Sequence, residues 1–342
     1  MKSFFVLLAC VYFCNADLFE GDIILDKHTE DIVLGKNAFD AVKSDSKKWT
    51  GAVVPYIFDS NFESSRRDVV RQAIAEYNKY TCIRWVPRTN QRNHVKFIVG
   101  GGCYSYVGMS GGQQVISIGQ HCDKKGIVIH EMMHCMGFWH EQSRLDRDSY
   151  IRIFWENISN GRQNHNFKKY SHGEGDYYGE GYDFDSVMHY GNWAFSTNNK
   201  MTIQAKSDPK KMLGQRDGFS PIDVKQLNKV YQCKGYENVK VPPPKGCIDR
   251  DNKCADYAKW GQCETNERYM LQYCCKTCKD KAGGSGGTGT GGTGTGGTGG
   301  GSDCKNNHSN CDTWAGRGYC NHSTEGTRRY MKKYCRKACK FC

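Results

Sequence analysis

The sequence predicts an α+β domain, in which a twisted sheet and two main helices surround a cleft, followed by two small disulfide-rich modules. Three observations support this fold class. Between residues 49 and 233, apolar residues recur at the spacings of strands and helices. Residues 130–141 read HEMMHCMGFWHE, which places two histidines one helical turn apart. Of the 19 cysteines, 12 follow residue 245, so the cysteine-rich tail is separate from the conventional core.

The N-terminal segment has the features of a leader in two parts. Residues 1–16, MKSFFVLLACVYFCNA, form an apolar run after one lysine and end in a small residue, which is typical of a cleaved secretory signal. The run is too short for a transmembrane helix, which needs about 20 apolar residues. Residues 17–36 are acidic and end in Lys36, where a trypsin-like protease could cut. We therefore expect a secreted, extracellular protein without a membrane span, whose domain begins at residue 37.

The elements of the domain follow in order along residues 37–234. They are a strand at 53–58, a helix at 65–81, strands at 94–100, 103–108 and 114–119, and a helix at 124–137. In the first helix, Val69, Ile74 and Tyr77 fall at helical spacing. The second is apolar at spacings of three and four and ends at Gly137, a plausible C-cap. The strand CYSYVG at 103–108 is expected at the edge of the cleft.

The tail is expected to consist of two modules and two linkers. Residues 235–246 contain VPPPKG, a proline-stiffened linker that ends the domain. Residues 247–281 and 303–342 each hold six cysteines. Residues 282–302 between them are almost wholly Gly, Thr and Ser, which predicts a flexible coil with an r.m.s. span of about 25 Å. The two modules should therefore move nearly independently.

The histidine-rich stretch contains the pattern of a catalytic zinc site. His130 and His134 lie one helical turn apart, and Gly137 lets the chain leave the helix. His140 can then return as a third ligand, and three protein ligands leave an open position for water. Glu131 stands beside the ligands, where a carboxylate can accept a proton from that water. HExxH alone is a weak signal, but the full H-E-x-x-H-x-x-G-x-x-H pattern matches the metzincin signature. We expect one Zn²⁺ per domain.

Five longer stretches carry a resemblance to one family: KWTGAVVPYIF, TCIRW, ISIGQHCDKKGIVIHE, HEMMHCMGFWHE and SVMHYG. They resemble the astacin family of zinc endopeptidases, over residues 17–233. The resemblance implies zinc ligands and a general base, namely His130, His134, His140 and Glu131. It also implies that Met188 forms an apolar turn beneath the metal. Tyr190 would be a fifth ligand that swings aside and stabilises the oxyanion. The alternative is that Met188 and Tyr190 are core residues only, but their position downstream of the zinc motif favours the functional interpretation.

The same resemblance implies a latent form that the leader maintains. Residues 19–22, FEGD, resemble the family's inhibitory motif, in which an aspartate, here Asp22, occupies the position of water on zinc. A carboxylate is a competent zinc ligand. In the family, the mature N-terminus reaches the glutamate after the third histidine. This implies that Glu141 holds the ammonium of Asn37 after cleavage behind Lys36. The alternative is that Glu141 is a surface residue that bonds nothing.

The resemblance also implies two disulfides in the domain. They join Cys82 to Cys233 and Cys103 to Cys122. Cys135 is then left over, between two predicted metal ligands. We expect it to be a small buried hydrophobe with a free thiol, and a redox or metal-ligand role is the alternative.

Both tail modules resemble ShKT modules, with CADYAKWGQC and CDTWAGRGYC as the matching centres. In the second, the family's pairing joins Cys304 to Cys342, Cys311 to Cys335 and Cys320 to Cys339. In the first, Lys281 stands where a last cysteine is expected and Cys275 is extra, so we expect Cys275 to pair with Cys247. The other cysteines expected in disulfides there are Cys254, Cys263, Cys274 and Cys278.

The ShKT resemblance raises a rival function. Some ShKT peptides block potassium channels through a neighbouring lysine and tyrosine, and Arg268-Tyr269 and Arg329-Tyr330 fall near that place. Arginine is not a conservative exchange for a compact ammonium that enters a pore. The alternative to an enzyme is therefore a non-enzymatic protein that binds channels or matrix on a protease scaffold. Since all the catalytic residue types are present, the sequence favours the enzyme.

Charge and modification signals bear on partners. The chain has a formal charge of +12, and the part after residue 36 is at about +15. In the second module nine lysines and arginines face three acids, so a polyanionic matrix or cell surface is a candidate partner. Sequons at Asn157, Asn307 and Asn321 are glycosylation candidates. Asn157 lies in a stretch that resembles the family, where burial could disfavour a glycan.

These observations together predict a secreted astacin-like zinc metalloendopeptidase that is activated by propeptide removal. It would hydrolyse peptide bonds of extracellular proteins. An extended polypeptide substrate would pair with the edge strand as an added strand. The other expected partner is the activating trypsin-like protease, and no nucleic acid is expected.

Overall fold

The computed structural model describes most of the main domain and parts of the leader and tail. The described residues are 18–33, 47–158, 161, 166–169, 178–244, 248–249, 253–266, 269–270, 273–278, 311–316, 319–321, 331, 335 and 337–340. The chain forms two compact units, Met1–Ser285 and Gly286–Cys342, which are described separately. The predicted signal (1–16) and spacer (282–302) lie outside the described residues. Within the described parts, no helix is both long and apolar enough to cross a bilayer.

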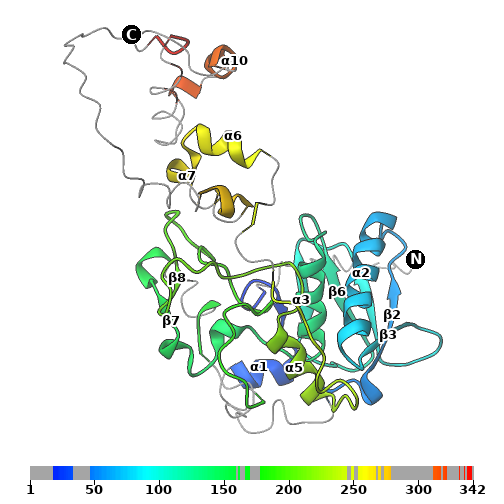
Figure 1. Ribbon diagram of the computed structural model, residues 1–342. Coiled ribbons are helices and arrows are strands. Elements are labelled where there is room, and N and C mark those ends of the chain that lie inside the picture. Colours follow the sequence, from blue (N-terminus) through cyan, green and yellow to red (C-terminus); the bar gives the residue numbers. More distant parts are fainter. Residues whose placement is uncertain are drawn as a thin grey trace, which may run out of the picture. The chain divides into compact units, whose positions relative to one another are not determined.

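One mixed sheet of six strands forms the first half of the main domain (Figure 1). In spatial order its strands are β1 (Ile23–Ile24), β5 (Cys103–Tyr106), β6 (Gln113–Ile118), β4 (His94–Ile98), β2 (Val53–Phe58) and β3 (Arg84–Pro87). β5 and β6 are antiparallel, whereas all other neighbours are parallel. The mixed sheet and its helices confirm the predicted α+β class. β1 and β3 go beyond the strands predicted from the sequence.

Two helices pack together beside the sheet, at the predicted positions (Figure 1). α2 (Ser64–Tyr80) buries Val70, Ala73 and Tyr77, whereas Val69 is only half-buried. Ile74 and Tyr77, two of the three residues singled out from the sequence, are buried, and Val69 packs against the same core. α3 (Lys125–Cys135) is buried on nearly every side, because it lies between the sheet and the rest of the domain.

A second, smaller core lies beyond α3 and makes the domain two-lobed. Its two strands, β7 (Ile151–Ile153) and β8 (Ile203–Ala205), are antiparallel. The buried residues of this core are Ile151, Ile158, Phe167, Tyr182, Tyr190, Ile203, Ala205 and Leu213. They form a cluster distinct from the main core around α2 and α3. Each of the two lobes expected from the sequence thus has a core of its own.

A third helix, α5 (Pro221–Val230), was not among the two predicted from the sequence. Ser220 caps it with its side chain, and the Asp223 carboxylate accepts a hydrogen bond from the Ser220 backbone N–H, which completes a capping box. Pro221 stands at the first helical position, where its missing N–H costs nothing. The apolar side of α5 joins the main core through Leu227. The S-P-I-D sequence is therefore a sufficient helix-start signal.

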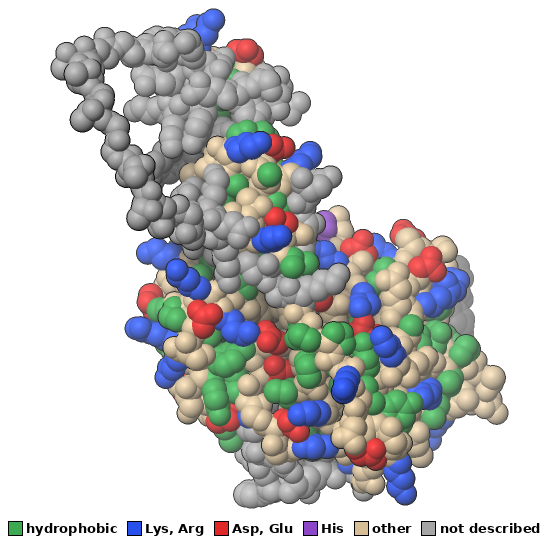
Figure 2. Space-filling view, viewed as in Figure 1, with side chains coloured by type: hydrophobic (Ala, Val, Ile, Leu, Met, Phe, Trp, Pro, Cys, Tyr) green, Lys and Arg blue, Asp and Glu red, His purple; other side chains and the backbone are tan. Residues whose placement is uncertain are grey.

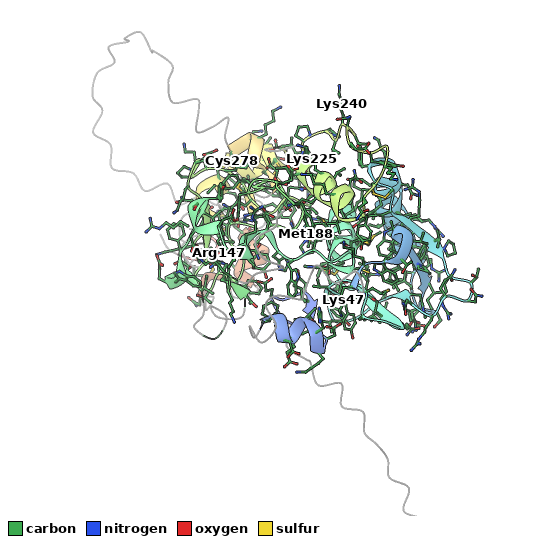
Figure 3. The ribbon with its side chains drawn as sticks, turned by 90° about the horizontal axis from the view of Figure 1, so that it is seen from below. Lys47, Arg147, Met188, Lys225, Lys240 and Cys278 are labelled. Carbon is green, nitrogen blue, oxygen red and sulfur yellow. A yellow bond between two sulfur atoms is a disulfide. The ribbon has the colours of Figure 1, made fainter. Side chains whose placement is uncertain are left out.

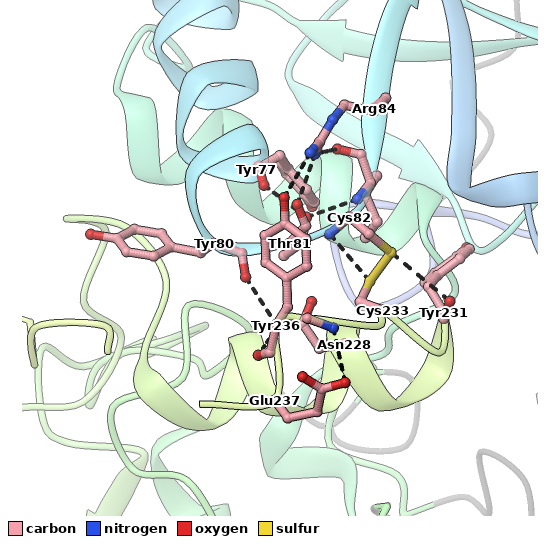
Figure 4. The surroundings of a disulfide bond; sticks show 12 residues. Tyr77, Tyr80, Thr81, Cys82, Arg84, Asn228, Tyr231, Cys233, Tyr236 and Glu237 are labelled. Carbon is pink, nitrogen blue, oxygen red and sulfur yellow. Dashed lines mark hydrogen bonds between the residues drawn. A yellow bond between two sulfur atoms is a disulfide. The ribbon is translucent and has the colours of Figure 1, made fainter. Parts of the chain in front are cut away.

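The Cys82–Cys233 disulfide ties the end of the domain to its first half (Figure 4). It bridges 151 positions of sequence, so it restricts the unfolded chain strongly. Neighbouring hydrogen bonds tie the same segments, since the Asn228 side chain donates to the Tyr80 carbonyl at 3.0 Å. The Arg84 guanidinium donates to the Tyr236 hydroxyl at 2.8 Å. A second disulfide joins Cys103 to Cys122.

Each tail module has a core of cystines and short helices. The first contains α6 (Cys254–Lys259) and α7 (Gln262–Thr265), with disulfides Cys254–Cys274 and Cys263–Cys278. Cys275 is also disulfide-bonded, but its predicted partner Cys247 lies outside the described residues. The second contains α10 (Cys311–Gly316), with disulfides Cys311–Cys335 and Cys320–Cys339. The predicted Cys304–Cys342 pair lies outside the described residues.

We expect Gly126→Ala to lower the free energy of unfolding, although alanine is the better helix former by about 1 kcal/mol. A Cβ at residue 126 would overlap the backbone of Arg216, which cannot move aside as the end of a side chain can. Overpacking of a core costs about 1–3 kcal/mol. Chemical denaturation measures the change. In the control Gly101→Ala, the new Cβ meets nothing within 4 Å. A gain in stability from Gly126→Ala would show that this contact is absent.

Candidate active site

Helix α3 and the turn after it bring three histidines together. His130 and His134 lie one turn apart, with ring centroids 4.7 Å apart. After the helix, Gly137 takes a φ of 101°, in the left-handed region that favours glycine. The chain then turns back, so that the His140 ring lies 4.7 Å from that of His134. All three predicted ligands are buried side by side.

The leader adds a carboxylate to the three histidines. A tight turn forms where Phe19 and Ile23 exchange two backbone hydrogen bonds of 2.9 Å. Glu20 and Gly21 at its tip both have a positive φ, of 52° and 88°. The turn aims the carboxylate of Asp22 at the histidines, and these four residues place ligand atoms within 4.8 Å of one another.

Three of the four donor atoms of this cluster, from Asp22, His130 and His140, have the spacing of a zinc tetrahedron, whereas Nε2 of His134 lies 3.8 Å from Oδ1 of Asp22. Oδ2 of Asp22 lies 3.2 Å from Nε2 of His130 and 3.2 Å from Nε2 of His140. The two nitrogens are 3.3 Å apart. A tetrahedral zinc with metal–nitrogen distances of about 2.0–2.1 Å requires donor separations of about 3.3–3.4 Å. Nε2 of His134 and Oδ1 of Asp22 are buried, and neither has a hydrogen-bond partner among the described residues. The side chains present therefore fit a zinc ion.

The main domain itself orients two of the imidazoles. Nδ1 of His130 lies 2.8 Å from the Val187 carbonyl, and Nδ1 of His134 lies 2.7 Å from the Phe138 carbonyl. A carbonyl can only accept, so each Nδ1 carries the proton and each Nε2 lone pair faces the cluster. Burial lowers the pKa of His130 to about 4 and the pKa of His134 well below its ordinary value. Both rings are therefore neutral, as metal ligands must be.

Glu131 is positioned to handle protons. Its side chain is buried, and its Oε2 atom has no hydrogen-bond partner among the described residues. Burial, followed by repulsion from Asp22, raises the pKa of Glu131 well above its ordinary value. The Arg216 guanidinium acts in the opposite direction and lowers it. Perturbed carboxyl groups of this kind cluster at functional sites, which makes Glu131 a candidate for proton transfer.

A buried turn at residues 186–188 supports the histidines from below. Asp223 of α5 accepts hydrogen bonds from the Ser186 hydroxyl at 2.7 Å and from the Val187 N–H at 2.9 Å. Val187 in turn contacts His130 through its carbonyl. Met188, the predicted floor residue, is buried in the main core, in the interior of the domain (Figure 3). The carboxylate of Asp223 thus caps α5 and also, through Val187, helps to orient His130.

Tyr190 lies against the third histidine. The two ring centroids are 4.6 Å apart, and the Tyr190 hydroxyl donates a hydrogen bond to the Glu20 carbonyl of the leader. Burial raises the pKa of Tyr190 well above its ordinary value, so the phenol is protonated. In the uncleaved chain the leader therefore engages this hydroxyl. The role of Tyr190 as a zinc ligand remains a prediction.

Glu141 is buried and is not the exposed residue that was the alternative. One carboxylate oxygen accepts hydrogen bonds from Arg144 at 3.1 Å and from the Asp183 N–H at 2.8 Å. Burial raises the pKa of Glu141 to about 8 even with Arg144 beside it. The predicted partner, the N-terminus at Asn37, lies outside the described residues.

The leader covers β5, the strand that was predicted to lie at the edge of the cleft. Its strand β1 pairs in parallel with β5, with Ile23 opposite Ser105. Phe19 packs edge-on against Trp139, with ring centroids 6.4 Å apart. At the start of α1 (Lys27–Val33), Asp26 forms a 2.6 Å ion pair with Lys47, which Figure 3 labels beside that helix. Without β1, strand β5 would be the edge of the sheet.

The remaining predicted residues are either buried, exposed or outside the described residues. Cys135 is buried and is a free thiol, and burial raises its pKa. Asn157 is buried, and its side-chain nitrogen donates to the Met201 carbonyl at 2.6 Å, so this amide is not available to a glycan. Asn321 is exposed. Asn307, Arg268, Arg329 and Tyr330 lie outside the described residues.

Three residues shape the site although the sequence analysis assigned them no role: Glu20, Arg216 and Asp223. The capping box could have revealed Asp223, because Ser-x-x-Asp before an apolar run is a helix-start signal. Glu20 lies in the FEGD motif, from which only Asp22 received a role, and Arg216 carries no local signal. Glu20 meets His140 from 120 positions away, and no local pattern encodes that contact.

The chain is similar to known families along most of its length. Residues 41–232 match the family model described as Astacin, a peptidase family, and residues 246–280 and 303–342 match the ShK domain-like family. Zinc metalloproteinase nas-6 of Caenorhabditis elegans is 36% identical over 290 residues, which cover 78% of this chain and 83% of the relative. Meprin A subunit beta of Rattus norvegicus is 39% identical over 219 residues, 64% of this chain and 30% of the relative. Among solved structures, High choriolytic enzyme 1, a hatching enzyme zinc-protease from Oryzias latipes, matches with a TM-score of 0.53 and 38% identity. This match covers 56% of this chain and 97% of that chain.

We expect Glu141 to make the uncleaved chain less stable as pH rises. Its pKa is about 8 in the folded chain against 4.5 ordinarily, so between these values the folded state holds a proton that the unfolded chain has released. This stabilisation is complete below about pH 4.5 and is lost as pH rises through about 8. Urea denaturation at several pH values should show a weaker pH dependence for Glu141→Gln, which cannot titrate. The control is the exposed Glu156→Gln, and equal pH dependence in Glu141→Gln and wild type would contradict the assignment.

Proposed function

Because the chain belongs to the astacin family of peptidases, we propose that this zinc endopeptidase is a secreted zymogen that acts on extracellular proteins. The observation that carries the proposal is that Asp22 and the three histidines place ligand atoms within 4.8 Å of one another, with 3.2–3.3 Å between those of Asp22, His130 and His140. The leader supplies one corner of the cluster, and cleavage would free that corner. An apolar N-terminal run and several disulfides favour the secretory route, because disulfides form and persist in oxidising compartments.

In the proposed mechanism, His130, His134 and His140 hold the zinc. The bound metal supplies a Lewis acid that lowers the pKa of a water molecule toward about 7 and polarises the peptide carbonyl. Glu131 accepts the proton of that water and passes it to the leaving amine, since its buried carboxylate is next to the ligands. Tyr190 donates a hydrogen bond to the oxyanion once its hydroxyl is free of Glu20.

The leader blocks the site in two ways. Asp22 takes the position that water needs, and β1 covers the edge of β5 against which an extended substrate would pair. A trypsin-like protease would remove both by cutting behind Lys36. The new ammonium of Asn37 would then reach Glu141, a buried carboxylate that favours a cationic neighbour.

We expect Glu131→Gln to retain zinc and to lose proteolysis by about 10²–10⁴-fold, because the amide keeps the shape of the side chain but cannot accept the proton. Metal analysis and a quenched-peptide assay of the cleaved protein measure the two properties. The exposed Glu156→Gln serves as the control. Zinc loss from Glu131→Gln would show that this residue binds the metal and would contradict its role as the base.

Asp22→Ala should give the uncleaved chain measurable activity, because the fourth position of the metal site would be open to water. The comparison is uncleaved variant against uncleaved wild type on one peptide, with an inhibitor of serine proteases present. Asp31→Ala, which removes a leader carboxylate that pairs with Lys27 on the surface of α1, is the control. Equal, near-zero activity in variant and wild type would assign latency to other leader contacts.

The second ShK module is proposed to tether the enzyme to polyanionic surfaces. Nine lysines and arginines against three acids lie within this short, disulfide-framed module. On the face of the main domain in Figure 2, by contrast, basic and acidic side chains are interspersed. The spacer between the modules would let the second one bind while the protease reaches its substrate.

Such binding should be strongly salt-dependent, because surface charges are screened over about 8 Å at physiological ionic strength. We expect the full-length chain to elute from heparin at higher salt than a truncation that ends at Lys281. Elution of both at the same salt concentration would reject the tether.

A further inference from the structure

Glu20 of the leader makes contacts that the latency motif does not explain. Its side chain is fully buried, and Oε2 accepts a hydrogen bond from Nδ1 of His140 at 2.6 Å. Oε1 accepts a hydrogen bond from the Ser143 hydroxyl at 2.5 Å. Its backbone carbonyl accepts a hydrogen bond from Tyr190. One leader residue thus bonds three groups around the third histidine.

The third histidine differs from the other two in the source of its support. His130 and His134 donate from Nδ1 to neutral backbone carbonyls of the catalytic domain. His140 has the carboxylate of Glu20 in the equivalent place. The first two partners remain after cleavage, whereas the third leaves with the leader.

The backbone conformation of Glu20 also indicates a role for its side chain. Its φ of 52° lies in the left-handed region, where glycine is favoured and a residue with a side chain is strained. The next residue, Gly21, has a φ of 88° and carries no such strain. A glutamate at the first of these positions is explained by what its side chain does, since the turn alone would be served by glycine.

We infer that Glu20 is a positioning residue of the metal site in the uncleaved chain, distinct from the blocking residue Asp22. Its carboxylate holds the proton of His140 on Nδ1 and fixes the plane of the ring, so that Nε2 faces the cluster. The leader therefore both blocks the site and secures its metal. This inference rests on the proposed zinc ligands.

The physical basis is the strength of a charge-assisted hydrogen bond. A carboxylate acceptor holds an N–H about twice as strongly as a neutral acceptor and raises the basicity of the imidazole toward a metal. Loss of such a partner typically costs about 10- to 100-fold in metal affinity. Asp22, which lies on the metal side of the ring, cannot replace this contact.

The test measures zinc release from the full uncleaved chain to a chromogenic chelator such as 4-(2-pyridylazo)resorcinol. We expect Glu20→Ala to release zinc about 10-fold faster, or to bind it about 10-fold more weakly, than wild type. The rate of zinc release from Glu20→Gln should lie between those of Glu20→Ala and wild type. Its amide can still accept a hydrogen bond from Nδ1 and donate one to Ser143, but it has no charge. Glu30→Ala, an exposed carboxylate of the same leader, should match wild type.

Cleavage supplies an internal control. Once the leader is removed, the Glu20 variants and wild type are the same polypeptide, so their zinc release must coincide. Melting temperatures of the zinc-free uncleaved chains show whether the variants fold. If Glu20→Ala does not fold, zinc release is compared between wild type and Glu20→Gln, which keeps the shape and the hydrogen bonds of the side chain.

Wild-type rates of zinc release in the folded uncleaved variants would overturn the inference. Failure of uncleaved wild type to bind one zinc per chain would instead overturn the proposed ligands, so the two failures are distinguishable.

Discussion

The approach of one carboxylate to three imidazole nitrogens is the contact on which the rest of the structure depends. Asp22 reaches His130 and His140 at 3.2 Å because a two-residue left-handed turn in the leader meets a left-handed glycine after α3. The histidines in turn are held by carbonyls, by the buried turn below them and by the cap of α5. Segments that are far apart in the sequence therefore together position the donor atoms of Asp22 and the three histidines.

The charges around these donor atoms indicate that the leader affects the pKa of Glu131 as well as the access of water to the proposed metal site. Glu20, which is buried, and Asp22, which is partly exposed, add two carboxylates to a site that already contains Glu131, and Arg216 lowers the pKa of Glu131. Departure of Asp22 removes a repulsion that raises the pKa of Glu131. Glu131 would then be more readily ionised, because a like charge nearby disfavours the charged form. The proposed cleavage would therefore open the position for water and favour the ionised form of the proposed base.

Local patterns predicted the parts of the structure that depend on local geometry. The spacing of His130 and His134 places them on one helix face, and a following glycine indicates the turn to His140. Asp22 and Glu141 were accessible only through resemblance, because nothing in their neighbourhood encodes a partner more than 40 positions away. The contacts of Glu20, a residue of the FEGD motif, and of Arg216 were not predicted, since they arise only when the leader and the lobes fold together. On α2, helical spacing indicated the buried residues Ile74 and Tyr77, whereas Val69 lies at the margin of the same face and is half-buried.

The most direct test of the account is a crystal structure of the zinc-loaded, uncleaved chain, with the metal located by anomalous scattering at the zinc edge. The account predicts one zinc bound by Nε2 of His130, His134 and His140 and by a carboxylate oxygen of Asp22, each at about 2.0–2.2 Å. It also predicts that no water lies between Asp22 and the metal. A zinc with a water in the fourth position, and Asp22 turned away from it, would contradict the account.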